Sequence, residues 1–272
     1  MDNRPIGFFD SGLGGLTCIP YLMEALPSER IIYFGDTART PYGSKAVRTL
    51  RNFSFEITDF LAAKDVKMIV IACNTVSATC LAALRERHPN IPILGIISPA
   101  ARTVARICDE TNRIGVIGTK ATVRSGAYRN KILKFNPALD ICETACSALV
   151  PLIEEGIIQN EIMDMSIRYY LDHFIAYNRI DTLVLGCTHY PLIRKNITKI
   201  YPDVSIVNPS EEVLSSILDT LAAGDLRAAE QTGEHIFYAS DLSENFVAMI
   251  NRIFQNTGFT VVFKNFELGD IA

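Results

Sequence analysis

The sequence has no long apolar run and no cluster of basic residues. None of its stretches approaches the roughly 18–20 apolar residues that a membrane-spanning helix needs. Its first residues, MDNRPIGFFDSG, lack the pattern of a secretory signal peptide. The formal net charge is −4, and the lysines and arginines are not clustered as a nucleic-acid surface requires. We therefore expect a cytoplasmic protein that binds neither membranes nor nucleic acids.

The sequence also lacks the spacings of common phosphate-binding and metal-binding motifs. The glycine cluster at Gly12–Gly15 has neither the GxGxxG spacing nor a Walker lysine. The seven cysteines are an odd number without a signal peptide, which indicates free thiols in a reducing compartment. Cys142 and Cys146 are four residues apart and could share a helix face as metal ligands, but no matching pair lies nearby. We expect no metal site.

What the chain does contain is two rounds of short apolar runs, each followed by a turn and an amphipathic segment. Hydrophobic residues make up 49% and charged residues 21%, as in ordinary globular proteins. The apolar runs suit strands that are buried on both faces of a parallel sheet. We expect them at Ile6–Phe9, Ile31–Phe34, Val66–Ala72 and Ile93–Ile97, and again at Arg113–Ile117, Asp140–Cys142, Thr182–Leu185 and Ser205–Val207. The pattern predicts an α/β fold.

The order of elements indicates a weak internal duplication. Gly7 corresponds to Gly115, Cys73 to Cys187 and Pro99 to Pro209 at similar offsets. We predict two pseudo-symmetric lobes, each a mostly parallel sheet flanked by helices, with the chain crossing at Ser98-Pro99 and Asn208-Pro209. The first lobe would hold residues 1–97 plus 209–272 and the second residues 98–208, with a strand at Ile236–Ala239 and a helix at Glu244–Phe254 returning to the first.

Two segments, one in each half, share a sequence pattern that indicates a functional site. KMIVIACNTVSA (67–78) and DTLVLGCTHYPLI (181–193) each run from a buried strand into a small residue, a cysteine and two polar residues. Parallel α/β sheets bind ligands at the carboxyl ends of their strands, and the N–H groups of a following helix favour a thiolate there. We expect Asp10, Cys73, Thr119 and Cys187 to line one cleft between the lobes.

Several interpretations of the paired cysteines stay open at this point. Each thiol could be a base on one face of a substrate carbon, so that proton removal on one side and return on the other inverts a stereocentre. Cys187 could instead be a nucleophile with His189 as its base, which leaves Cys73 unexplained. A metal site, or thiols that only fill the core, are further possibilities. The duplicated setting favours the two-base interpretation.

The chain resembles the cofactor-independent aspartate/glutamate racemase superfamily along nearly its whole length. The matching blocks are IGFFDSGLGGLT, IIYFGDTARTPYGSK, IVIACNTVSA, RIGVIGTKATVRSGAY, SALVPLIEEG and LVLGCTHYPLI, in the same order. The resemblance implies conversion of L-glutamate to D-glutamate for bacterial peptidoglycan, without pyridoxal phosphate, metal or nucleotide. It also implies a homodimer, because the family often dimerises. An aspartate racemase is the alternative, and a non-catalytic ligand binder or a secondary role in inhibiting a partner is a more distant one.

The resemblance also assigns roles to individual residues. Cys73 and Cys187 match the catalytic cysteines, of which the first acts on the D enantiomer and the second on the L enantiomer. Asp10 and His189 match residues that tune the thiols, and Glu154 matches a carboxylate near the second thiol. The residues that would bind substrate are Asp10, Ser11, Pro41, Tyr42, Gly43, Asn74, Thr75, Thr119, Thr188 and His189. Asp36 lies in a matching block without a settled role. Because two anionic sulfurs would repel, we expect one thiolate and one thiol in each resting form.

Overall fold

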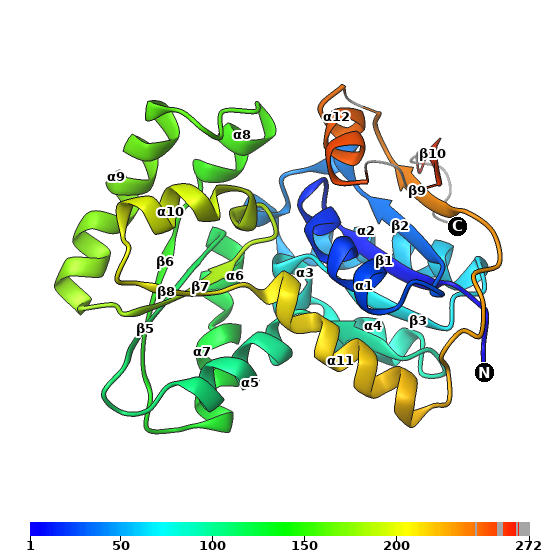
Figure 1. Cartoon of the computed structure of the whole chain (residues 1–272), viewed down its shortest axis with the longest axis horizontal. Helices are drawn as coiled ribbons and strands as arrows, with labels where there is room; N and C mark the ends of the chain where they lie inside the picture. Colours follow the sequence, from blue (N-terminus) through cyan, green and yellow to red (C-terminus); the bar gives the residue numbers. More distant parts are fainter. Residues whose placement is uncertain (243, 255–257, 265, 267–272) are drawn as a thin grey trace.

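The protein contains two parallel sheets flanked by helices, as expected from the sequence (Figure 1). This computed structural model describes residues 1–242, 244–254, 258–264 and 266. The first sheet has the order β10-β9-β2-β1-β3-β4 and the second the order β6-β5-β7-β8. The strands are β1 Ile6–Asp10, β2 Ile31–Gly35, β3 Met68–Ile71, β4 Ile93–Gly95, β5 Arg113–Gly118, β6 Asp140–Ala145, β7 Thr182–Gly186, β8 Ser205–Val207, β9 His235–Ala239 and β10 Phe259–Phe263.

Successive residues of a strand point to opposite faces of the sheet, and in these strands the residues on both faces are apolar. Helices therefore cover both faces of each sheet. The α-helices are α1 Ile19–Ala25, α2 Val47–Ala63, α3 Asn74–Thr79, α4 Leu81–Arg87, α5 Ile97–Ile107, α6 Lys120–Ser125, α7 Ala127–Phe135, α8 Leu149–Glu154, α9 Glu161–Asn178, α10 Arg194–Ile200, α11 Pro209–Ala223 and α12 Glu244–Ile253. Short 3₁₀ helices lie at η1 Gly14–Cys18, η2 Thr37–Arg39, η3 Tyr42–Ser44 and η4 Tyr190–Ile193. None of the helices in these described ranges is both long and apolar enough to cross a bilayer.

One apolar core runs through both sheets. Phe8 and Val70 of the first sheet and Val116 and Val184 of the second belong to the same buried cluster, which α5, α7 and α11 complete. The opposite faces have separate cores, one beneath α2 and α4 and the other beneath α8, α9 and α10. The two sheets are therefore joined by packed helices and not by a flexible linker.

The two expected crossing points are helix starts. Pro99 lies in the first turn of α5, so the fourth strand ends at Gly95 and not at Ile97. Pro209 is the first residue of α11, and the side chain of Asn208 caps that helix by accepting a hydrogen bond from Ser210 N at 3.1 Å. Proline is tolerated in the first turn of a helix because its missing N–H would have no partner there.

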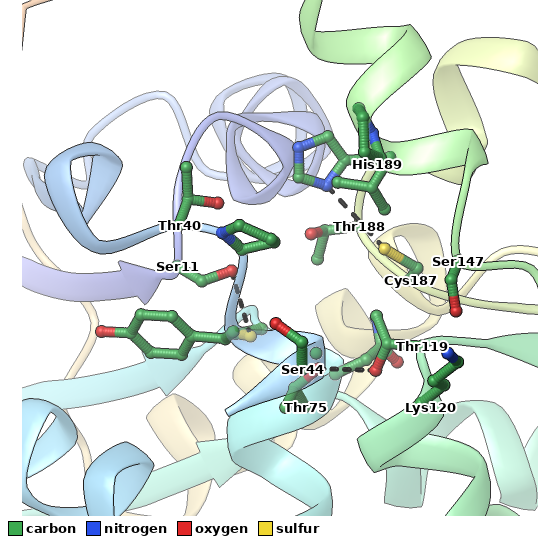
Figure 2. Close-up of a pocket in the computed structure, with 17 residues that line it drawn as sticks. Ser11, Thr40, Ser44, Thr75, Thr119, Lys120, Ser147, Cys187, Thr188 and His189 are labelled. Atoms are coloured by element: carbon green, nitrogen blue, oxygen red, sulfur yellow. Dashed lines mark hydrogen bonds between the residues drawn. The ribbon is translucent and has the colours of Figure 1, made fainter. Parts of the chain in front are cut away.

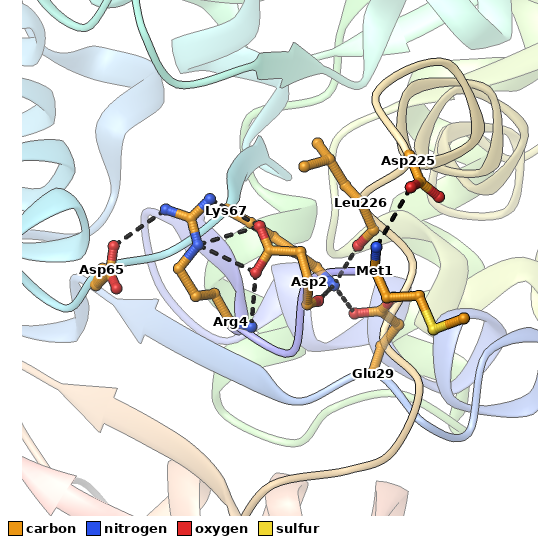
Figure 3. Close-up of polar contacts among 8 residues, drawn as sticks. All are labelled: Met1, Asp2, Arg4, Glu29, Asp65, Lys67, Asp225 and Leu226. Atoms are coloured by element: carbon orange, nitrogen blue, oxygen red, sulfur yellow. Dashed lines mark hydrogen bonds and ion pairs between the residues drawn. The ribbon is translucent and has the colours of Figure 1, made fainter.

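A buried ion pair fixes the chain where it returns to the first sheet (Figure 3). Lys67 Nζ lies 2.6 Å from Glu29 Oε2, and both side chains are almost fully buried. The same Nζ donates to the carbonyl oxygens of Asp2 and Leu226, each at 2.7 Å. One ammonium group thus joins the amino-terminal segment, the segment before β2 and the segment after α11. From there the chain continues into β9, which pairs with β2.

Candidate active site

A pocket of about 120 Å³ lies where residues that follow strands of both sheets meet (Figure 2). The predicted site residues that line it are Ser11, Pro41, Tyr42, Gly43, Cys73, Asn74, Thr75, Thr119, Cys187, Thr188 and His189. Asp10 was expected to line the cleft but is not part of the pocket lining, and neither is Glu154. Thr40, Ser44, Lys120, Ser147, Val150 and Pro151 complete the wall and were not expected from the sequence.

The two cysteines reach this pocket from different sheets. Cys73 follows β3 and is the residue before α3, whereas Cys187 follows β7 directly. Both are buried, with 3% and 6% of their surface exposed. The strand–cysteine–polar pattern in each half therefore brings the sulfurs of Cys73 and Cys187 to one cavity.

Cys73 has surroundings that favour the neutral thiol. Its Sγ donates a hydrogen bond to Ser11 Oγ at 3.5 Å. Burial, and then the nearby Asp10 carboxylate, raise the pKa of the Cys73 thiol to about 12. A backbone N–H of the six-residue helix α3 lowers this pKa, as the strand–cysteine–helix pattern leads one to expect, but burial and Asp10 outweigh it.

Cys187 has a different neighbour, the imidazole of His189. His189 Nδ1 lies 3.8 Å from Cys187 Sγ, and His189 Nε2 lies 3.1 Å from Glu154 Oε1. Burial by itself lowers the pKa of His189, but the hydrogen bonds with Cys187 and Glu154 outweigh burial and raise the pKa to about 10. His189 is therefore an imidazolium at neutral pH, and its positive charge faces the sulfur of Cys187.

Asp10 supports the first wall of the pocket from behind. Its fully buried carboxylate accepts hydrogen bonds from Gly15 N at 2.9 Å and Gly12 N at 3.2 Å, and Thr188 Oγ1 donates to it at 3.4 Å. Burial raises the pKa of Asp10, although His189 and the N–H groups of the glycine loop oppose the shift. Asp10 thus shapes the turn after β1 and places a carboxyl group beside Cys73.

The two sides of the pocket are in close contact at two glycines. A Cβ on Gly14 would lie 2.4 Å from Thr188 Oγ1, and a Cβ on Gly43 would lie 2.5 Å from Thr119 Cβ. Thr75 Oγ1 and Thr119 Oγ1 are hydrogen-bonded across the same boundary at 3.0 Å. Only glycine fits at positions 14 and 43 without displacing the opposite wall.

Asp36 positions the loop that carries Thr40 to Ser44. Its buried carboxylate accepts hydrogen bonds from Arg39 Nε at 2.7 Å, from Ser240 Oγ at 2.8 Å and from the Tyr42 hydroxyl. Asp36 does not line the pocket. Its contacts instead fix the segment Thr40-Pro41-Tyr42-Gly43 that does.

Two buried polar groups of the pocket have no hydrogen-bond partner among the described residues. They are Asn74 Nδ2 and Ser147 Oγ. The Asn74 side chain is held at its other end, where Oδ1 accepts from the Tyr128 hydroxyl at 2.5 Å. A buried donor without a partner costs about 1–3 kcal/mol. Both groups are therefore poised to bind a ligand that enters the pocket.

The site contains positive charge but no cluster suited to a metal. Lys120 begins α6 and lines the pocket, and Figure 2 shows it on the same side as Ser147. Over the described ranges, no group of three or more His, Cys, Asp and Glu side chains is arranged to hold a metal ion. Cys142 lies in strand β6 and Cys146 after it, so this pair does not share a helix face. All seven cysteines are free.

The fold and the pocket define a two-sheet α/β protein in which each sheet contributes a cysteine to a common cavity. Residues 18–216 match the family model described as Asp/Glu/Hydantoin racemase, and the chain belongs to this family. The resemblance inferred from the sequence is thereby confirmed.

Three similar proteins extend this result. The chain is 43% identical to a glutamate racemase of Geobacter metallireducens, with 93% of each chain covered. A crystal structure of glutamate racemase from Francisella tularensis in complex with D-glutamate has a TM-score of 0.89 and 37% identity, and covers 99% of this chain and 100% of that one. A glutamate racemase isoform from Bacillus anthracis has a TM-score of 0.90 and 32% identity, with 98% and 99% covered.

Proposed function

We propose that this chain is an isomerase that interconverts L-glutamate and D-glutamate without a cofactor. In the proposed two-base mechanism, one cysteine removes the α-proton and the other delivers a proton to the opposite face of the same carbon. The observation that carries the proposal is that Cys73 and Cys187, from different sheets, line one small cavity. The substrate follows from the similar proteins, which are named glutamate racemases, one of them in complex with D-glutamate.

The proposed reaction begins from unequal charge states of the two sulfurs. With L-glutamate, the Cys187 thiolate beside the His189 imidazolium takes the α-proton, and the Cys73 thiol gives its proton to the opposite face of the same carbon. The product is D-glutamate, and the enzyme is left with a Cys187 thiol and a Cys73 thiolate. D-glutamate then reacts through the reverse sequence, so each direction starts from its own form of the enzyme.

The carbanion-like transition state needs preorganised donors in a cavity that excludes water. The hydroxyls of Ser11, Thr75 and Thr119 and the Asn74 amide are the proposed partners of the substrate carboxylates. We add Ser147 to this group because its buried hydroxyl has no partner among the described residues. Lys120 supplies positive charge that suits a dicarboxylate.

The geometry also supports a second candidate function. Cys187, His189 and Glu154 form a chain of contacts with Sγ–Nδ1 and Nε2–Oε1 distances of 3.8 and 3.1 Å, which resembles the nucleophile–base–carboxylate arrangement of thiol hydrolases. In a hydrolase Cys73 would have no role in the chemistry. Loss of activity on replacing Cys73 therefore separates the two functions.

The test is a racemisation assay on the purified chain with no added cofactor. Wild type is expected to racemise glutamate and not aspartate, and Cys73→Ala and Cys187→Ala are each expected to lose activity by about 100-fold or more. Cys142→Ala, a half-buried cysteine outside the pocket, is the control and should keep full activity. Full activity in either pocket variant would exclude the two-base mechanism. Faster turnover of aspartate than of glutamate would show that aspartate is the preferred substrate.

We further propose that the D-glutamate serves peptidoglycan synthesis in the cytoplasm and that the chain forms a homodimer. Seven free cysteines support a reducing compartment. Restored growth of a bacterium that requires D-glutamate, after expression of this chain but not of Cys187→Ala, would test the cellular role.

A further inference from the structure

Tyr128 is a fully buried tyrosine that contacts a pocket residue without lining the pocket itself. It is the second residue of α7, which flanks the second sheet and packs against α3, the helix that follows β3 of the first sheet. The Tyr128 hydroxyl donates a hydrogen bond at 2.5 Å to Oδ1 of Asn74, the first residue of α3. One hydrogen bond therefore connects a pocket residue of the first half with a core residue of the second.

The direction of this hydrogen bond follows from its atoms and its length. A separation of 2.5 Å falls within the range of O–H···O contacts and below that of N–H···O contacts, which begins at about 2.7 Å. A carbonyl oxygen can only accept, so the phenol is the donor. Burial raises the pKa of Tyr128 well above its ordinary value, and the nearby Cys187 adds to the shift, so the hydroxyl keeps its proton. The Asn74 amide thus points its oxygen at Tyr128.

The ring of Tyr128 is packed in a way that restricts where its hydroxyl can lie. It belongs to the apolar core that runs through both sheets. It also lies against Gly186, the last residue of β7, where an added Cβ would come within 3.1 Å of Tyr128 Cε2. The hydroxyl is therefore held in place by the core and by the strand that leads to Cys187.

The other end of the Asn74 amide is free to bind a ligand. Asn74 lines the pocket, and its buried Nδ2 has no hydrogen-bond partner in the part of the chain that the structure describes. Because Tyr128 already occupies Oδ1, the group that the amide offers to a ligand is a donor. A donor suits a carboxylate oxygen, which only accepts. An amide turned by half a rotation would present its oxygen and repel a carboxylate.

We propose that Tyr128 is a positioning residue, which acts through Asn74 to keep an amide N–H directed at a substrate carboxylate. The inference rests on the proposed function, in which the Asn74 amide binds a carboxylate of glutamate. Without the Tyr128 hydroxyl, Oδ1 would be buried without a donor whenever Nδ2 binds substrate. The amide would gain by turning its oxygen toward the pocket, where water can donate to it before substrate arrives. Substrate binding has to reverse this turn, so the loss falls on affinity.

Tyr128→Phe tests the inference, because it removes the hydroxyl and keeps the ring that the core requires. The dissociation constant for glutamate, measured by titration calorimetry, should rise about ten- to hundredfold, as expected when one buried acceptor is left without a donor. KM should rise in parallel with little change in kcat, because the carboxylate is bound equally before and during proton transfer. Tyr21→Phe is the matched control. Its hydroxyl donates to Glu211 Oε1 at 2.7 Å outside the pocket lining, so its loss should leave the dissociation constant unchanged.

A double-mutant cycle separates positioning from a purely structural role. Asn74→Ala should itself raise the dissociation constant for glutamate. Adding Tyr128→Phe to this variant should raise the constant no further, because Tyr128 acts only through the amide that is already missing. A tyrosine that merely joined the two halves would weaken binding by the same factor in both backgrounds. That result, an unchanged dissociation constant in Tyr128→Phe, or a loss confined to kcat would overturn the inference.

Calorimetry also keeps this inference separate from the proposed reaction, because it measures binding without requiring turnover. A wild type that binds glutamate but does not racemise it would contradict the proposed function alone. The dissociation constants of the single and double variants would then still decide whether Tyr128 positions the Asn74 amide.

Discussion

The two thiols differ in their neighbours more than in their positions. Each sulfur follows a strand, as the repeated sequence pattern predicted. However, Cys73 is beside the carboxyl group of Asp10, and Cys187 is beside the imidazolium of His189. Burial and Asp10 raise the pKa of Cys73, whereas Cys187 faces the imidazolium ring of His189. The sequence pattern predicted that both sulfurs reach one cavity, but it could not show that Asp10 and Glu154 lie outside the pocket lining, because their positions depend on contacts between distant segments.

His189 makes the stability of the fold depend on pH. Its pKa is raised from 6.5 to about 10, since hydrogen bonds with Cys187 and Glu154 outweigh burial. A raised pKa contributes stability that is fully present below the unfolded value and is lost as pH rises through the folded value. We therefore expect the advantage of wild type over His189→Gln in free energy of unfolding to shrink between about pH 6.5 and about pH 10. Urea unfolding at several pH values measures it, and a constant difference would contradict the assignment.

Ser147 is expected to help bind glutamate while lowering the stability of the free protein. Ser147→Ala removes a buried hydroxyl that has no partner among the described residues, so the free protein should keep or gain stability, by up to about 1–3 kcal/mol. The same change should raise KM for glutamate about tenfold with little effect on kcat, because it removes a hydrogen bond to a charged group. Ser215→Ala is the control, since that hydroxyl already donates to the Glu212 carbonyl on α11. An unchanged KM would assign Ser147 to packing alone.

At the scale of elements, the sequence predicted strands better than the segments between them. The run Ser205–Val207 is strand β8 as expected, because short β-branched runs bounded by polar residues have few alternatives. The segment after Cys73 forms two short helices, α3 and α4, that meet at Cys80, and no feature of the local sequence marks that break. After the glycine loop, the chain first forms the 3₁₀ helix η1 and continues as helix α1 only from Ile19. These boundaries are set by tertiary contacts of the glycine loop and of the pocket, which no local pattern contains.

The predictions for the last part of the chain, after α11, were only partly confirmed. The expected strand and helix correspond to β9 and α12, whereas β10 at Phe259–Phe263 was not predicted. β10 lies at the edge of the first sheet and pairs with β9, so its formation depends on a neighbour that the sequence does not reveal. The missed wall of the pocket has the same cause: Val150 and Pro151 reach it because α8 packs beside η4.

At the scale of the whole molecule, the internal duplication predicted two parallel sheets but not how they are joined. A common core of α5, α7 and α11 connects them. The lobe limits at residues 97/98 and 208/209 remain a prediction; they fall at the starts of α5 and α11, and residues 243, 255–257, 265 and 267–272 of the first lobe lie outside the described part of the chain.

The Lys67–Glu29 pair is expected to hold the return of the chain to the first sheet. Lys67→Met leaves the Glu29 carboxylate buried without its cation, which should lower the free energy of unfolding by about 3–5 kcal/mol. Lys199→Met, which removes the mostly exposed partner of Asp164, should cost less than about 1 kcal/mol. Chemical denaturation of both variants gives the comparison. Equal effects would show that burial of the pair is unimportant.

The central claim, that two cysteines exchange protons with opposite faces of one carbon, is tested most directly by racemisation of unlabelled L-glutamate in deuterated water. At early times, mass spectrometry of the separated enantiomers should find deuterium at the α-carbon of D-glutamate and almost none in the remaining L-glutamate. This is expected because Cys187 removes the proton while Cys73 delivers a solvent-derived deuteron. Deuterium appearing equally fast in the unconverted L-glutamate would show that a single base serves both faces, and the two-cysteine account would be wrong.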